Sequence, residues 1–126
     1  MTLARSLLLA VSLVAVAAQA QAPLIKRTLL QRVDLNDGRE AIMGLAEIGS
    51  GGSTGRHTHF GSEMGYVIEG STQLEVEGEP TRTYKAGESY TIPAGKIHNA
   101  TAVGGAAKVV ATYLVDKDKP LATPAP

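Results

Sequence analysis

From Thr28 onward, short segments rich in Val, Ile, Thr and Tyr alternate with glycine-containing turns, which is typical of a chain built from strands. Within residues 73–77, Gln and Glu alternate with Leu74 and Val76, so one face of that strand is expected to meet water and the other the core. No segment has the period of a helix. Nine strands are predicted, at residues 29–33, 40–48, 55–59, 63–69, 73–77, 81–84, 89–92, 97–102 and 108–115.

Turn residues separate most of these strands, for example Asn-Asp-Gly at 36–38 and Gly-Ser at 70–71. Many short strands in an open sheet would leave edges exposed, and exposed edges promote aggregation. We therefore predict an all-β fold, a small antiparallel β-barrel or jelly roll, in one domain over residues 23–116. Residues 117–126 contain three prolines and no periodicity, so they are expected to form a loose tail.

The strand at 63–69 lacks the usual polar face. If Glu63 points inward, residues 65 and 67 do so too, and Met64, Tyr66 and Ile68 point outward, so both faces are largely apolar. An apolar outer face of this kind needs a cover. Either an N-terminal strand or a second subunit, in a homodimer, is expected to supply it.

Residues 1–22 are predicted to be a secretory signal peptide. Arg5 precedes an apolar run over 7–18, and cleavage after Ala20 or after Ala22 fits the small-residue pattern equally well. The run has 12 residues, against the roughly 20 that a membrane-spanning helix needs, so a retained anchor is the weaker alternative. We expect a periplasmic or secreted protein with no stable membrane insertion after cleavage.

Composition limits the partners and the sources of stability. Cleavage after Ala22 leaves 104 of the 126 residues, enough for one small domain and too few for two. The mature chain then has 11 basic and 12 acidic groups, with no basic block, which argues against nucleic acid as a partner. Because the chain has no cysteine, disulfides and thiolate metal ligands are excluded.

The three histidines of the chain lie where one metal ion could collect them. His57 and His59 project from the same side of an extended strand, about 7 Å apart at their backbones, and His98 lies in a later strand. Glu63 is the candidate fourth, anionic ligand. Imidazole and carboxylate suit a divalent transition metal ion such as Fe, Mn, Ni, Cu or Zn. The alternative is a hydrogen-bonded polar cluster inside the barrel, which is costly to bury without a cation.

The spacing of these residues resembles the first motif of the cupin superfamily, G(X)5HXH(X)3,4E(X)6G. Here the motif runs from Gly51 through His57, His59 and Glu63 to Gly70, and every specified position matches. The resemblance therefore identifies the same candidates as the argument from ligand chemistry.

A second stretch resembles the second cupin motif, G(X)5PXG(X)2H(X)3N. It runs from Gly87 through Pro93 to His98, and only the last position differs, because Ala102 stands where the family has asparagine. The nearby Asn99 has an odd offset from Ala102, so a strand would place it on the opposite face. That asparagine is not a usual ligand, so the departure affects no ligand assignment.

The resemblance implies a small barrel that holds one metal ion through His57, His59, Glu63 and His98. Within the superfamily, the chain is most similar to the quercetin-dioxygenase-like group. This resemblance implies an oxygenase that acts on a small organic molecule, with Glu63 as a catalytic proton acceptor. Two other interpretations stay open. One is a metal-dependent isomerase, lyase or decarboxylase that uses no O2, and the other is a non-catalytic periplasmic binding module.

Other pocket candidates are less specific. Arg56 and Glu47 are the charged residues to test for substrate contact, although charged strand residues usually face solvent. Phe60 could form a wall at the pocket mouth. Any of the four tyrosines could supply a proton donor, but strand tyrosines more often serve in packing. The tyrosines are Tyr66, Tyr84, Tyr90 and Tyr113.

Overall fold

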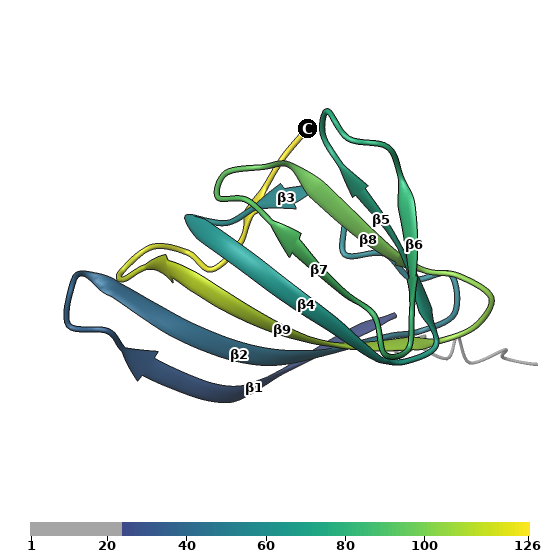
Figure 1. Ribbon diagram of the computed structural model, residues 1–126, viewed down its shortest axis with the longest axis horizontal. Helices are drawn as coiled ribbons and strands as arrows, with labels where there is room; N and C mark the ends of the chain where they lie inside the picture. The colour runs from purple at the N-terminus through teal and green to yellow at the C-terminus, as the bar shows by residue number, and fades with distance from the viewer. Residues whose placement is uncertain (1–23) are drawn as a thin grey trace, which may run out of the picture.

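The computed structural model describes residues 24–126, which form two antiparallel five-stranded sheets that lean against each other (Figure 1). The first sheet has the order β1-β2-β9-β4-β7 and the second the order β10-β3-β8-β5-β6. The strands are β1 (Ile25–Asp34), β2 (Arg39–Ile48), β3 (His57–Thr58), β4 (Gly61–Glu69), β5 (Ser71–Val76), β6 (Arg82–Lys85), β7 (Ser89–Ile92), β8 (His98–Ala102), β9 (Ala107–Asp116) and β10 (Thr123–Pro124). The predicted all-β architecture is therefore confirmed.

Each of the nine predicted strands corresponds to one of β1 to β9. The largest difference is at β1, which has ten residues where five were predicted. The strand β3 has two residues where five were predicted, so His59 lies just beyond its end. The β1–β2 connection is the predicted tight turn, in which Asn36 and Gly38 both have positive φ and the Asn36 amide donates to Asp34. The predicted signal peptide, its cleavage sites and residue 23 lie outside the described residues.

The core lies between the two sheets. Each strand that borders it alternates buried and exposed side chains, as β7 does with Tyr90 and Ile92 inward. One apolar cluster joins the sheets at their centre and consists of Val67, Leu74, Val76, Tyr90, Ile92, Ala100 and Val109. The inner face of β4 enters this core with Val67 but places a carboxylate, Glu63, at its other end. The core therefore contains one buried anion beside apolar packing.

The outer face of β4 is exposed, as its sequence pattern predicts. Met64, Tyr66 and Ile68 expose 45%, 49% and 40% of their surface. The N-terminal strand β1 pairs with β2 at the edge of the same sheet, so it does not cover this face. The alternative cover by an N-terminal strand is therefore wrong for the described residues. The homodimer stays a prediction.

The C-terminal segment differs from the expected loose tail. Thr123 and Pro124 pair with β3 as β10, and the Ala125 amide donates to the carbonyl of Arg56. Proline blocks only one backbone donor at such an edge, so it does not prevent short pairing. The segment crosses beside β3 in Figure 1.

Residues 24–126 contain no helix that is long and apolar enough to cross a membrane.

Close packing of β4 on β9 makes a test of this fold. A Cβ on Gly61 would overlap the Leu114 carbonyl, which backbone pairing holds in place, whereas a Cβ on Gly44 would lie 3.7 Å from the nearest atom. We expect Gly61→Ala to lower the free energy of unfolding by about 2 kcal/mol or more. Gly44→Ala, the matched strand variant, should leave it within about 1 kcal/mol.

Urea unfolding followed by circular dichroism measures both variants. Equal stability of Gly61→Ala and the unmodified protein would contradict the β4–β9 register.

Candidate metal centre

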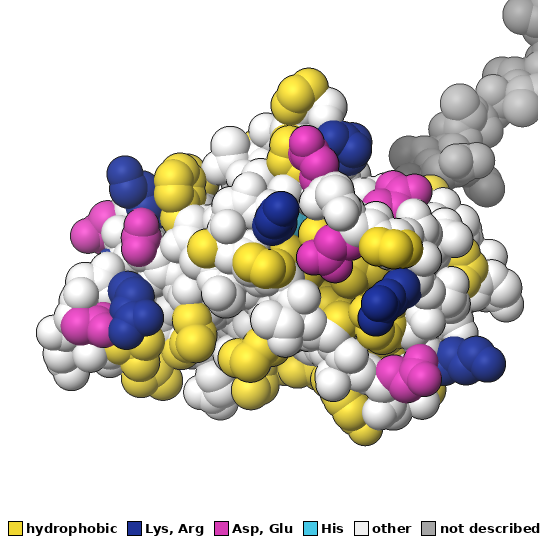
Figure 2. All heavy atoms as spheres, turned by 45° about the horizontal axis from the view of Figure 1, so that its top comes forward, with side chains coloured by type: hydrophobic (Ala, Val, Ile, Leu, Met, Phe, Trp, Pro, Cys, Tyr) yellow, Lys and Arg dark blue, Asp and Glu magenta, His cyan; other side chains and the backbone are white. Residues whose placement is uncertain are grey.

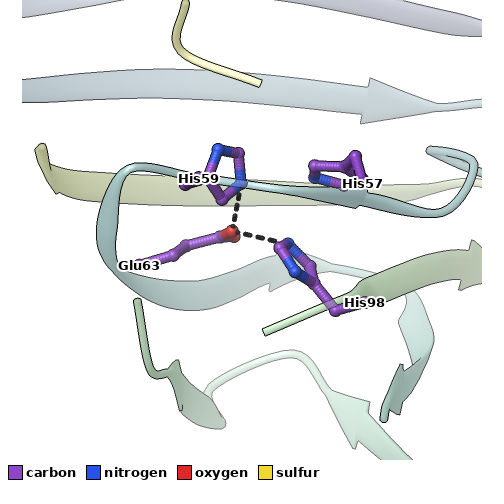
Figure 3. A group of neighbouring side chains, drawn as sticks. All are labelled: His57, His59, Glu63 and His98. Atoms are coloured by element: carbon purple, nitrogen blue, oxygen red, sulfur yellow. Dashed lines mark hydrogen bonds and ion pairs between the residues drawn. The ribbon is translucent and has the colours of Figure 1, made fainter. Parts of the chain in front are cut away.

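The histidines and the glutamate predicted from the sequence come together at one point inside the sandwich (Figure 3). His57 lies in β3, directly opposite His98 at the start of β8, so the backbone pairing of two strands brings these two rings together. His59 follows β3, and Glu63 lies on the inner face of β4. The ligand atoms of all four residues lie within 4.8 Å of one another, and all except His57 are buried.

Two loops hold His59 and His98 in place. The amide of Gly95 donates to the carbonyl of His59 at 3.1 Å, which ties the Pro93–Gly95 turn to the end of β3. The next residues of that turn lead directly into His98. The conformation of one ligand loop therefore depends on the other.

Each imidazole is oriented by a backbone carbonyl at its Nδ1 atom. The Nδ1 atoms of His57 and His98 lie 2.8 Å from the carbonyls of Gly55 and Lys96, two residues earlier in each case. A carbonyl can only accept a hydrogen bond, so each Nδ1 must carry the proton. The Nε2 atoms are then the free ligand atoms of neutral rings.

The third carbonyl comes from the C-terminal segment. Leu121 places its oxygen 2.5 Å from Nδ1 of His59, across 62 residues of sequence. Sequence analysis missed this contact, because a backbone carbonyl leaves no signature in the residue type. The segment is therefore part of the site rather than a loose extension.

The Nε2 atoms of His59 and His98 face the carboxylate of Glu63. If both rings are neutral and carry their proton on Nδ1, no hydrogen bond can form between these atoms. The two Nε2 atoms lie 3.0 and 3.1 Å from Oε2 of Glu63. A neutral ring that donates from Nδ1 presents a lone pair at Nε2, and a carboxylate also presents lone pairs. His59 Nε2 is the buried side-chain atom left without a hydrogen bond among the described residues. A cation between these atoms would remove the conflict.

The pKa shifts of Glu63 and His57 favour an ionised carboxylate and a neutral imidazole at the site. Burial raises the pKa of Glu63, but hydrogen-bond donation from His59 and His98 and positive charge on them outweigh burial and lower it to about 2, and a cation placed between these atoms would act in the same direction. Burial also lowers the pKa of His57, which keeps that ring neutral. The site thus offers three imidazole rings and one ionised carboxylate, which are ligand types that a divalent transition metal ion accepts.

The donor set fits a divalent transition metal ion. The ligand atoms lie within 4.8 Å of one another, which is close enough for one ion to contact all four. Four protein ligands leave one or two positions for a small molecule on an ion that accepts five or six. The four residues could therefore hold such an ion, and their chemistry does not choose among Fe, Mn, Ni, Cu and Zn.

The four side chains open into a cavity of about 480 Å³. This volume suits a small organic molecule. Its wall combines apolar side chains, such as Ile48, Val109 and Leu121, with the phenols of Tyr90 and Tyr113. In Figure 2 a small area of histidine is visible beside a basic side chain, so part of a histidine side chain reaches the surface on this face.

Two of the four tyrosines belong to the cavity. Tyr90 donates to Oε1 of Glu63 at 3.5 Å, and the ring of Tyr113 packs on His59 with centroids 4.7 Å apart. Burial and the charge of Glu63 raise the pKa of both phenols, so both are neutral donors. Tyr66 is exposed on the outer face, and Tyr84 packs against the core.

The other residues proposed from the sequence differ in whether they line the cavity. Arg56 lines the cavity, but its Nε donates to the carbonyl of Pro126 at 2.6 Å. Glu47 does not line it, because it lies on the opposite face of β2 and pairs with Lys26 and Lys108. Phe60 lines a separate surface hollow. Glu47 and Phe60 are therefore wrong as pocket residues.

Asn99 lies on the opposite face from Ala102, as predicted. Its side chain accepts from Ser53 at 2.6 Å and donates to Glu75 at 3.3 Å, away from the metal ligands. Ala102 is buried and packs with Ile48. The one departure from the second motif therefore leaves the site intact.

Arg27 was missed by sequence analysis although it lines the cavity. The predicted first strand began at residue 29, whereas β1 begins at Ile25 and places Arg27 opposite Ala46. Both residues face the cavity. A longer first strand with the same alternation would have placed Arg27 on the inner face.

Comparison with known proteins gives the same fold. The family model described as "Cupin domain" matches residues 44–114, more than half of the chain, and this range includes all four candidate ligands. Among curated proteins, none matches the chain.

Several solved structures superpose well on the chain. KdgF from Halomonas sp. has a TM-score of 0.65 at 23% identity, over 79% of this chain and 86% of the other. A cupin superfamily protein from Desulfitobacterium hafniense has a TM-score of 0.65 at 19% identity, over 78% and 84%. The DMSP lyase DddQ from Ruegeria pomeroyi has a TM-score of 0.63 at 16% identity, over 68% and 43%. Similarity at these identities shows the fold alone.

Proposed function

We propose that this chain, which belongs to the cupin family, is an exported metal-dependent enzyme of the dioxygenase-like kind that acts on a small organic molecule. One divalent transition metal ion would be held by His57, His59, Glu63 and His98. The observation that carries the metal is the orientation of the rings, since Nδ1 of each histidine faces a carbonyl and two Nε2 atoms face one carboxylate. Export rests on the predicted signal peptide in residues 1–22.

The proposed chemistry combines an ion with residues of the cavity. A bound ion would supply an open coordination position at which a substrate oxygen and O2 can be brought together. Glu63 is ionised and buried, so it could take a proton from a substrate hydroxyl in this cavity. Tyr90 and Tyr113 are neutral donors that can hydrogen-bond to substrate oxygens in the same cavity.

The partner implied by the cavity is a small molecule. A volume of about 480 Å³ with apolar walls suits one compact organic substrate and excludes a folded macromolecule. A homodimer through the exposed outer face of β4 is compatible with this opening, because that face lies on the far side of the sheet from the centre. Catalysis as proposed requires no second subunit.

Metal binding has a direct test. We expect His57→Ala and His98→Ala to lose stoichiometric metal when the purified variants are measured by inductively coupled plasma mass spectrometry, because each removes one of four ligands. Asn99→Ala is the matched control, since Asn99 adjoins His98 but points to the outer face. Full metal occupancy in both histidine variants would overturn the assignment.

The C-terminal segment provides a second test of the same centre. A chain ending at residue 120 lacks the Leu121 carbonyl that orients His59. Loss of such an outer partner typically costs about 10- to 100-fold in metal affinity. We expect a decrease of that size in competition titrations with a chromogenic chelator.

A chain ending at residue 124 is the matched control, because it keeps Leu121 and the β3–β10 pairing. Its metal affinity should stay within about threefold of the full chain, since no outer partner of a ligand is lost. Unchanged affinity in the chain ending at 120, with native circular dichroism, would contradict a role of the segment in the centre.

The reaction class is decided by oxygen consumption. Protein loaded with the ion found in its native compartment is screened against small organic molecules in an oxygen electrode. We expect substrate loss to be matched by O2 uptake and to stop under anaerobic conditions. Turnover without O2 would instead show an isomerase, lyase or decarboxylase, and tight binding without product would show a binding module.

A further inference from the structure

Arg27 brings a cationic side chain to the cavity from outside the family motifs. It lies in β1, outside the matched residues 44–114, and the backbone register places it opposite Ala46 of β2. Both residues line the cavity that contains the candidate ligands. Its neighbour Lys26 points to the other face of the sheet, where it pairs with Glu47 at 3.3 Å.

Arg27 has no ion pair and no side-chain hydrogen bond with any other residue in 24–126. The ion pairs of that part of the chain involve other cations, such as Arg32 with Glu40 at 3.5 Å. The second arginine of the cavity wall is occupied, because Arg56 donates to the Pro126 carbonyl at 2.6 Å and lies 3.8 Å from Glu77. Of the two arginines in the cavity wall, Arg27 is thus the one whose guanidinium has no partner among the described residues.

The position of Arg27 connects two hollows. A smaller cavity of about 230 Å³ lies along the inner face of β1 and β2, and it shares Arg27, Tyr113 and Leu121 with the main cavity. Tyr113 packs on the candidate ligand His59, with ring centroids 4.7 Å apart. Arg27 therefore lines the same cavity as an aromatic side chain that contacts the centre.

The charges of the cavity do not balance without an anion. Glu63 is the sole carboxylate among the described residues that line it; Arg56 is partly balanced by Glu77, whereas Arg27 has no counter-charge there. A divalent ion at the centre would add two positive charges and leave the cavity with a net positive charge. A carboxylate matches a guanidinium in planar, bidentate geometry, and the exposed Arg27 at the cavity rim has its donors available for one.

We propose that Arg27 selects a carboxylate-bearing substrate, holding its carboxylate at the rim while the apolar body of the molecule lies against Ile48, Val109 and Leu121 toward the centre. This inference rests on the proposed function, because it names the substrate class for the same cavity. It predicts that an organic acid binds more tightly than its uncharged isostere. Arg27 is then a specificity residue and no ligand of the ion.

The test compares benzoate with benzamide, which share a ring and differ in charge. Each is titrated by calorimetry into zinc-loaded full-length protein and into the variants Arg27→Gln and Lys26→Gln. Zinc is chosen because it holds the site without redox chemistry. We expect benzoate to bind at least about tenfold more tightly than benzamide, the size of one charge-assisted contact.

Arg27→Gln should weaken benzoate about tenfold, leave benzamide unchanged, and keep the zinc stoichiometry of the unmodified protein. Lys26→Gln, which removes the adjacent charge from the opposite face, should leave both probes unchanged. Added salt should weaken benzoate less in Arg27→Gln than in the unmodified protein.

Equal binding of benzoate and benzamide, or undiminished benzoate binding in Arg27→Gln, would overturn the proposal. An equal loss in Lys26→Gln would also do so, because it would show a general charge effect. If the unmodified protein takes up no zinc, the proposed metal-dependent function fails, and the same comparison in metal-free protein still decides the role of Arg27.

Discussion

The structure depends on one buried carboxylate surrounded by imidazoles. Glu63 is 5% exposed and ionised, and a lone anion at that depth would be very costly. The rings of His59 and His98 beside it lower that cost only if a positive charge lies between the nitrogen and oxygen atoms. Two sheets, two loops and the C-terminal segment all place groups around this point. The demand for a cation therefore explains why so many separate elements meet there.

Each element contributes a different part of that arrangement. The β3–β8 pairing sets His57 against His98, and β4 delivers Glu63 from the other sheet. Local carbonyls orient two rings, whereas the third ring relies on Leu121, far away in sequence. Pairing of β10 with β3 holds that carbonyl in place, so the tertiary fold acts directly on the ligand geometry.

The candidate metal ligands and the proposed substrate contacts come from different parts of the chain. The matched region, residues 44–114, contains the four candidate ligands, and the solved structures that share this fold include KdgF and a DMSP lyase. The residues that would distinguish a substrate, Arg27 and Leu121, come from the two flanking segments. Flanking segments tolerate change without loss of the core, which makes them suitable places for specificity to vary.

Side-chain alternation and motif spacing are local properties of the chain, so the strands, the inward face of β4 and the candidate ligand set could be predicted from the sequence. It also placed Asn99 correctly on the outer face. It misplaced Glu47 and Phe60, and it did not indicate Arg27 or the Leu121 carbonyl. Those outcomes depend on which strands become neighbours, where β1 begins, and how residues 117–126 return across β3. Such contacts join residues distant in sequence, so they became visible only in the folded chain.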